Sequence, residues 1–115
     1  MYSVCMIRKE LVAASVEPLI LSLLEKGESY GYAIIQDIKA RSREQMQWTD
    51  GMLYPVLHRM ERNGWIESRW DESETGRKRK YYSIKSDGRR VLKQQREQWS
   101  VVHNVLAGLW EEKHV

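Results

Sequence analysis

Residues 49–84 read TDGMLYPVLHRMERNGWIESRWDESETGRKRKYYSI, and they carry the clearest structural pattern in the chain. Its first part predicts a helix, because apolar residues recur at positions i, i+4 and i+7 and therefore share one face. These residues are Leu53, Leu57 and Met60. Thr49 or Asp50 can cap the start of this helix, and Asn63-Gly64 ends it. Trp48, just before the cap, is expected to anchor the preceding loop in the core.

A two-stranded hairpin is predicted after this helix. Residues 65–70 alternate in polarity, residues 80–84 are again β-prone, and Ser73-Glu74-Thr75-Gly76 reads as the turn between them. Side chains two apart in a strand share a face, so one side of the ribbon can pack on the helices. The residues expected there are Ile66, Trp70, Tyr82 and Ile84.

The first helix of the chain is predicted from about Lys9 to Lys26, closed by Gly27. Its second half is apolar on nearly all sides and should be buried. Proline breaks a helix interior but fits a first turn, so Pro18 predicts a kink or a fresh start near Val16, with Ser15 as the cap.

Two more helices flank the stretch. One begins after Ser29 and fades near Arg43, with a core stripe of Ile34, Ile35 and Ile38. The other begins at Ser86 as its cap and runs to about Lys113, which is about 39 Å at 1.5 Å per residue. A domain this small cannot cover so long a helix with its own core, so we expect it to need a partner.

Composition describes an ordinary folded protein of one domain: 115 residues, 42% hydrophobic and 30% charged, without phenylalanine. Cys5 is the only cysteine, which excludes an intrachain disulfide and a Cys-based zinc site and favours a reduced setting. The start, MYSVCMIRKE, becomes charged too soon for a signal peptide, and no later apolar run approaches a membrane span. We therefore expect a cytoplasmic protein without a membrane partner.

The sequence offers little for catalysis. The histidines are His58, His103 and His114, and they belong to no metal-ligand spacing. No Gly-rich loop stands between a strand and a helix, and nothing resembles a nucleophile elbow. We therefore expect no enzyme, no metal and no cofactor.

Charge is distributed unevenly along the chain. The formal net charge is +3, yet residues 76–96 carry nine Lys/Arg and one acid, Asp87, for a net charge of +8 against −5 elsewhere. Such a run is usually a solvated loop. Here it includes residues 77–80, Arg-Lys-Arg-Lys, in a hairpin that follows three helices, and a basic ribbon in that position suits a phosphate backbone.

The element order therefore predicts a mainly α fold with a β-hairpin wing, the winged variant of the helix–turn–helix. We assign residues 1–85 to a winged helix–turn–helix DNA-binding unit and residues 86–115 to a C-terminal dimerisation helix, together forming one compact domain. Opposite its apolar stripe, the third helix presents residues able to meet phosphates or base edges: Gly51, Tyr54, Pro55, His58 and Arg62. Taken alone, this face of the helix fits an ordinary solvent-exposed surface about as well as it fits a DNA contact.

Several motifs, in order, resemble the PadR family of bacterial transcriptional regulators over residues 16–99. They are Tyr30-Gly31-Tyr32, residues 51–61 (GMLYPVLHRME), residues 64–70 (GWIESRW) and residues 76–82 (GRKRKYY). The resemblance implies a winged helix–turn–helix repressor that acts as a homodimer on a palindromic operator and is often released by a small molecule. A winged-helix module that binds protein instead of DNA is the alternative.

Carried over by position, the resemblance implies that Tyr54 contacts a phosphate, and that residues 49–52 and His58 approach bases or backbone. The DNA-contact set is then Thr49, Gly51, Met52, Tyr54, Pro55, His58 and Arg62 with the wing residues Arg77, Lys78, Arg79 and Lys80. Two positions depart from the family pattern: Pro18 in the first helix, and Met52, where a small polar residue is usual.

The last helix carries a heptad seam, with apolar residues and Gln95 spaced alternately by three and four. The expected dimer contacts are Leu92, Trp99, Val102, Leu106 and Leu109. A long helix lying across its own domain is the simpler reading, but the spacing favours a two-fold dimer. Trp99 is most simply a packing anchor. Because some members of the family that this chain resembles stack flat, apolar effectors on such a tryptophan, Trp99 is also the candidate for a shared effector pocket.

Overall fold

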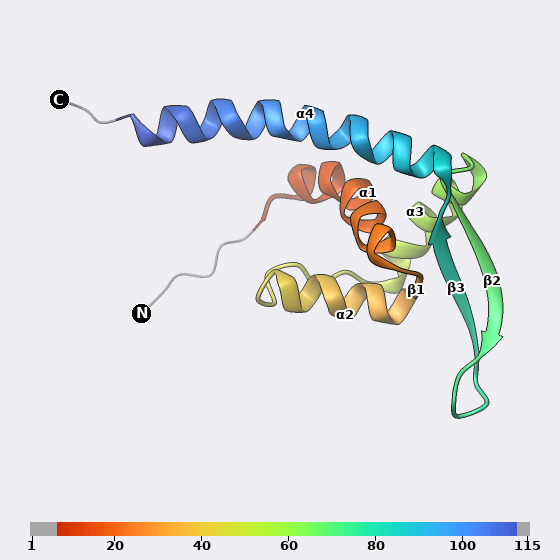
Figure 1. Cartoon of the computed structure of the whole chain (residues 1–115). Helices are drawn as coiled ribbons and strands as arrows, with labels where there is room; N and C mark the ends of the chain where they lie inside the picture. Colours follow the sequence, from red (N-terminus) through yellow and green to blue (C-terminus); the bar gives the residue numbers. More distant parts are fainter. Residues whose placement is uncertain (1–6, 113–115) are drawn as a thin grey trace.

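The computed structural model describes residues 7–112 as four helices and a three-stranded sheet (Figure 1). The elements are α1 (Lys9–Lys26), β1 (Ser29–Tyr30), α2 (Gly31–Arg41), α3 (Asp50–Arg62), β2 (Ile66–Glu72), β3 (Lys78–Ile84) and α4 (Ser86–Glu111). The sheet is antiparallel in the order β1-β3-β2. The predicted fold class, mainly α with a β-hairpin wing, is confirmed.

The core lies where α1, α2 and α3 meet the base of the wing. The apolar stripe of α3 is completely buried, as predicted: Leu53, Leu57 and Met60. Trp48 is 6% exposed and closes the core beneath the loop before α3. Thr49 is the cap of α3, its hydroxyl accepting a hydrogen bond from the Met52 amide at 3.2 Å. The spacing of apolar residues and the cap residue therefore predicted this helix correctly.

The expected fresh start in α1 is wrong. The helix is continuous through Pro18, and the Ser15 hydroxyl does not cap it but donates to the Val12 carbonyl at 2.9 Å. Proline cannot donate the hydrogen bond that its fourth preceding carbonyl needs. Burial of Val16, Ile20 and the leucines that follow holds this helix together despite the lost bond.

The sheet has a strand that the sequence did not predict. β1 is only two residues long and pairs with β3, placing Ser29 opposite Tyr82 and Tyr30 opposite Tyr81. β3 begins at Lys78, two residues before the predicted start of the strand at residue 80, so three of the four basic residues 77–80 belong to the strand itself. The expected packing of Trp70 on the helices is also wrong, because this residue is 66% exposed and does not belong to the core.

The N-cap of α4 lies one residue earlier than predicted, since Lys85 occupies the N-cap position and Ser86 is already helical. The predicted end near Lys113 lies outside the described residues. The start of α4 is pressed against the turn before β2: Lys85 donates its amide to the Trp65 carbonyl at 2.9 Å. A Cβ on Gly88 would overlap that same carbonyl, so glycine is required for this approach.

Leu92 was expected in the dimer seam, but it is 2% exposed and belongs to the core of its own chain. Beyond it, α4 continues past the body of the molecule toward the C-terminus (Figure 1). The molecule is therefore elongated, with principal extents of 63 × 37 × 22 Å. Among the described residues, no helix is both long and apolar enough to cross a membrane.

Candidate nucleic-acid interface

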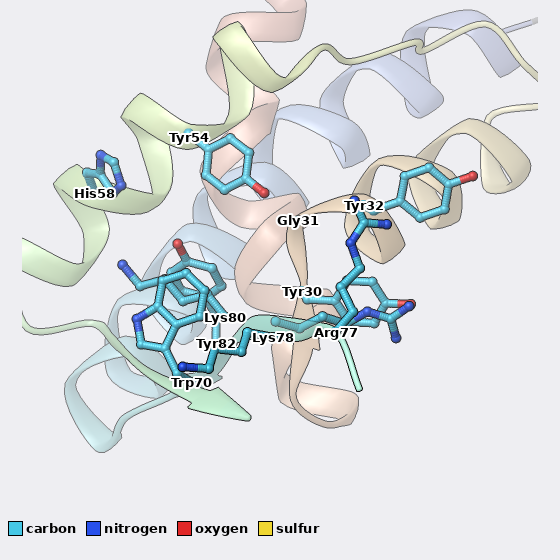
Figure 2. A pocket seen from close by; sticks show the side chains of 11 residues that line it. Tyr30, Gly31, Tyr32, Tyr54, His58, Trp70, Arg77, Lys78, Lys80 and Tyr82 are labelled. Carbon is cyan, nitrogen blue, oxygen red and sulfur yellow. The ribbon is translucent and has the colours of Figure 1, made fainter. Parts of the chain in front are cut away.

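A groove of about 560 Å³ opens between the wing, the exposed side of α3 and the start of α2 (Figure 2). We call it the wing groove. Its lining residues are Tyr30, Gly31, Tyr32, Tyr54, His58, Trp70, Arg77, Lys78, Arg79, Lys80 and Tyr82. Six of the predicted DNA contacts meet here although they come from two elements far apart in sequence: Tyr54, His58, Arg77, Lys78, Arg79 and Lys80.

Tyr54 is positioned by the absence of a side chain at Gly31. A Cβ on Gly31 would stand 2.8 Å from the Tyr54 ring carbon that carries the hydroxyl, and closer still to the hydroxyl oxygen. The ring therefore lies on the first turn of α2, half-buried, with its hydroxyl beside the helix N-terminus. Backbone amides at a helix N-terminus lack intrahelical partners and favour anions. Figure 2 shows the two elements meeting at this point.

The cations at residues 77–80 are not equivalent. Arg79 stacks its guanidinium 4.4 Å from the centre of the Tyr30 ring, and Lys80 Nζ lies 3.9 Å from a carboxylate oxygen of Glu61 on α3. These two contacts tie the wing to the body. The first two cations of the run are exposed and make no ion pair or cation–π contact within residues 7–112. They are the most available partners for a phosphate.

The outer face of the wing is stabilised by Arg69 on β2. Its guanidinium lies 5.1 Å from the centre of the Tyr81 ring and donates to Glu28 at 2.5 Å and to Asp71 at 2.7 Å. The hydrogen bond from Arg69, with that from the Glu72 amide, holds the pKa of the Asp71 carboxyl below its usual value. Glu28 directly precedes β1, and β1 leads into α2. The network therefore links β2 to the start of α2.

Tyr82 forms the floor of the groove. Its side chain is completely buried and its hydroxyl has no hydrogen-bond partner among the described residues. Burial raises the pKa of Tyr82 to about 12, helped by the neighbouring Glu61 carboxylate and by Tyr54. Glu61 itself accepts a hydrogen bond of 2.5 Å from the Ser68 hydroxyl. The floor of the groove therefore contains a neutral, buried hydroxyl close to the charged carboxylate of Glu61.

The remaining predicted contacts lie outside the groove. Thr49, Gly51, Pro55 and Arg62 are exposed on α3, whereas Met52 is half-buried and packs on the core beside Trp48. Met52 is thus placed for packing more than for base contact. Pro55 is the sixth residue of α3 and not part of its first turn, where a proline is best tolerated.

The basic residues of α4 were expected to join the wing in one docking surface, but they lie elsewhere. α4 starts at the end of β3 opposite the wing tip (Figure 1). There Arg90 pairs with Asp87, and Arg96 donates to Glu25 of α1 at 2.9 Å. The segment of net charge +8 is therefore divided between two places.

Sequence reasoning did not assign five of the groove residues to the site: Tyr30, Gly31, Tyr32, Trp70 and Tyr82. All five lie in the motifs that resemble the PadR family, which was the available signal, but the strand pattern assigned Trp70 and Tyr82 to the side that packs on the helices.

A second, smaller pocket of about 290 Å³ lies between α1 and α4. Its lining comprises Pro18, Ser22, Leu92, Arg96, Trp99, Ser100 and His103. Trp99, the predicted effector contact, is 38% exposed at this pocket. Pro18, the departure from the family pattern, contributes part of the opposite wall.

The C-terminal half of α4 exposes an apolar surface that we call the α4 apolar face. It contains the predicted seam residues Trp99, Val102, Leu106 and Leu109 together with Val101, Val105 and Trp110, which were not predicted. The face is therefore wider than a single heptad seam. Exposed apolar patches of this kind mark interaction sites more often than ordinary surface.

Comparison with known proteins gives a consistent result. Residues 20–94 match the Transcriptional regulator PadR-like family. An uncharacterised protein of Lysinibacillus sphaericus is 32% identical over 101 residues, covering 88% of this chain and 93% of that protein. A solved transcriptional regulator from Clostridium thermocellum superposes with a TM-score of 0.78 at 33% identity, covering 87% of this chain and 97% of that one. A PadR-like transcriptional regulator from Bacillus cereus gives 0.80 at 27% identity, covering 91% and 100%.

Proposed function

Because this chain belongs to the PadR-like family of transcriptional regulators, we propose that it is a homodimeric repressor that binds a palindromic DNA operator. The wing groove carries this proposal. It brings an exposed face of α3, the N-terminus of α2 and two cations without an ion pair in residues 7–112 to one surface. These are the three kinds of group that winged helix–turn–helix proteins present to a duplex.

In the proposed complex α3 enters the major groove, with its exposed residues Thr49, Gly51, Pro55, His58 and Arg62 facing base edges and backbone. The Tyr54 hydroxyl and the free amides of α2 bind one phosphate together. The wing lies along the adjacent backbone, where Arg77 and Lys78 bind phosphates. Met52 supports α3 from the core side and reads no base.

The dimer is proposed to form through the α4 apolar face within the C-terminal helix, residues 86–115. Burying its aromatic and aliphatic side chains against a second copy removes them from water, and a two-fold arrangement makes the face self-complementary. Two recognition helices then reach half-sites about 34–36 Å apart, one turn of DNA.

The pocket between α1 and α4 is proposed to take a small, flat, aromatic effector. Its volume is about 290 Å³, close to the lower limit of ligand pockets, which begin at about 300 Å³. Trp99 offers an aromatic face, and Arg96 and His103 offer polar groups at its rim. Because Trp99 also belongs to the α4 apolar face, a ligand stacked on it would act on the dimer interface.

A mobility-shift assay with the protein's own upstream region, at two salt concentrations, tests the function. Sequence-specific binding with a steep salt dependence supports a regulator. Tyr54→Phe keeps the ring on Gly31 but removes the hydroxyl, and Arg77→Ala removes one cation. Each should weaken binding, and Arg77→Ala should also lower the salt slope by about one, because it removes a cation. Unchanged affinity in both variants would show that the docking face is wrong.

The effector proposal has its own test. Planar aromatic compounds are titrated against tryptophan fluorescence in the wild type and in Trp99→Ala. Quenching should be lost in the variant, since the stacking partner is gone. Quenching that survives Trp99→Ala would exclude this pocket as the site.

A further inference from the structure

Trp70 is a large apolar side chain in an unusual place. It stands on β2 directly opposite Lys80 of β3, and its indole is 66% exposed although it faces the wing groove. Figure 2 shows the ring beside Lys78 and Lys80, on the side of the groove nearer His58. An exposed tryptophan surrounded by cations contributes little to the fold, so its position requires another explanation.

Internal contacts do not explain it. Within residues 7–112, every cation–π contact uses a tyrosine ring, at Tyr30, Tyr81 or Tyr82, and none uses Trp70. Glu61 on α3 holds Lys80 over Tyr82. The indole is therefore left uncovered by the helices and without a cation stacked on it.

We infer that Trp70 is a DNA-contact residue whose indole packs against the deoxyribose rings of the strand that the wing cations bind. This inference rests on the proposed function and names one more residue of the same surface. A sugar lies between two phosphates along each strand. A ring set among cations is therefore brought against the sugars when those cations bind the phosphates. The deoxyribose offers C–H surface, which an indole can cover and remove from water.

Such a contact has a different signature from a phosphate contact. Cations release counterions when they bind, so removing one changes the salt dependence of affinity. An apolar contact releases none. Trp70→Ala should therefore weaken operator binding about tenfold, the size expected for a truncated aromatic contact, while leaving the salt slope unchanged. Because the side chain is mostly exposed, the variant should keep the thermal stability of the wild type.

The experiment compares wild type, Trp70→Ala, Trp70→Phe and Lys78→Ala in operator titrations at several salt concentrations. Trp70→Phe should recover most of the lost affinity, because a smaller aromatic ring still covers the sugar. Lys78→Ala is the matched control from the facing strand, and it should lower the slope by about one. Trp70→Ala with unchanged affinity would overturn the inference, and so would a lowered slope in that variant, which would show that the ring acts by placing the cations.

Fluorescence gives a second readout. The chain has five tryptophans, and the emission change on operator binding should persist in Trp65→Phe, whose ring packs on the core, but be lost or strongly reduced in Trp70→Phe. An unchanged signal in Trp70→Phe would contradict the direct contact. Failure of the wild type to bind DNA would instead overturn the proposed function. Binding by wild type with no effect of Trp70 would leave that function standing and reject only the present inference.

Discussion

The wing groove and the α4 apolar face are both exposed surfaces, but they are built from different groups. The groove combines aromatic rings with cations and a buried hydroxyl, and contacts such as Arg79 on Tyr30 and Lys80 with Glu61 connect it to the body. The α4 apolar face contains no charged residue among its members and extends from the body on a single helix. One surface is suited to a charged partner and the other to an apolar one.

This difference determines how each surface should respond to perturbation. Binding at the groove should weaken with salt, because counterions are released when phosphates are bound. Association through the α4 apolar face should respond to protein concentration and only weakly to salt, because it depends on apolar burial. The helix that carries the α4 apolar face contacts the base of the wing at its start, where Gly88 packs on the Trp65 carbonyl.

The largest expected effect comes from removing the α4 apolar face. Truncation after Gln98 keeps Leu92 and the core but deletes every member of that face. We expect a monomer whose operator affinity is reduced about 100-fold or more, because the second half-site no longer binds intramolecularly. Light scattering coupled to gel filtration, followed by a mobility-shift assay, measures both. A truncated protein that remains dimeric would assign the interface elsewhere.

The next effect concerns the contact between the start of α4 and the turn before β2. In Gly88→Ala, the new Cβ would overlap the Trp65 carbonyl and approach Ile84 Cγ1 at 2.8 Å. A backbone carbonyl cannot rotate away, so we expect the free energy of unfolding to fall by about 1–3 kcal/mol.

Gly108→Ala is the matched control on the same helix, since a Cβ at this position would have no neighbouring atom within 4 Å. There the substitution should stabilise by about 0.5–1 kcal/mol, because glycine is costly inside a helix. Urea unfolding of both variants makes the comparison. Equal stability of the two would show that α4 does not press on the turn before β2.

Local pattern was enough for some of this architecture. The α3 stripe, its Thr49 cap and the burial of Trp48 follow from neighbours in sequence, and the structure confirms them. The strand β1 could not be predicted in that way, because two residues become a strand only by pairing with β3. Heptad spacing likewise identified an apolar face of α4 but could not tell that Leu92 is buried by its own chain.

The kinds of residue in the site could be predicted from the sequence, but their arrangement in space could not. The charge run indicated cations, yet only the register shows that residues alternate between the two faces of the wing, so Arg79 stacks on Tyr30 while Lys80 reaches Glu61. Alternation also put Trp70 on the correct face of its strand. It could not show that the ring stays mostly exposed, which depends on three-dimensional packing.

A smaller effect separates the two halves of the basic segment. Lys78→Ala in the wing groove should lower the salt slope of operator binding by about one, whereas Lys93→Ala on α4 should leave the slope unchanged. Both lysines are exposed, so neither substitution should affect folding. Titrations at several salt concentrations provide the slopes. An equal decrease of the salt slope in Lys93→Ala would show that the start of α4 also contacts DNA. The contrast between the wing and α4 would then disappear.

The smallest effect concerns the Tyr82 hydroxyl at the floor of the groove. Burial raises the pKa of Tyr82 to about 12, whereas an unfolded chain has a tyrosine pKa of about 10. Between these values the unfolded chain loses the proton and the folded chain keeps it, so stability falls as pH rises above about 10. Tyr82→Phe removes this loss. At pH 8 it should be neutral or stabilising by up to about 1 kcal/mol, because the buried hydroxyl has no partner among the described residues. Tyr32→Phe, on an exposed ring, is the control. Urea unfolding at pH 8 and near pH 11 gives the comparison, and an alkaline loss of the same size in wild type and Tyr82→Phe would show that another group is responsible.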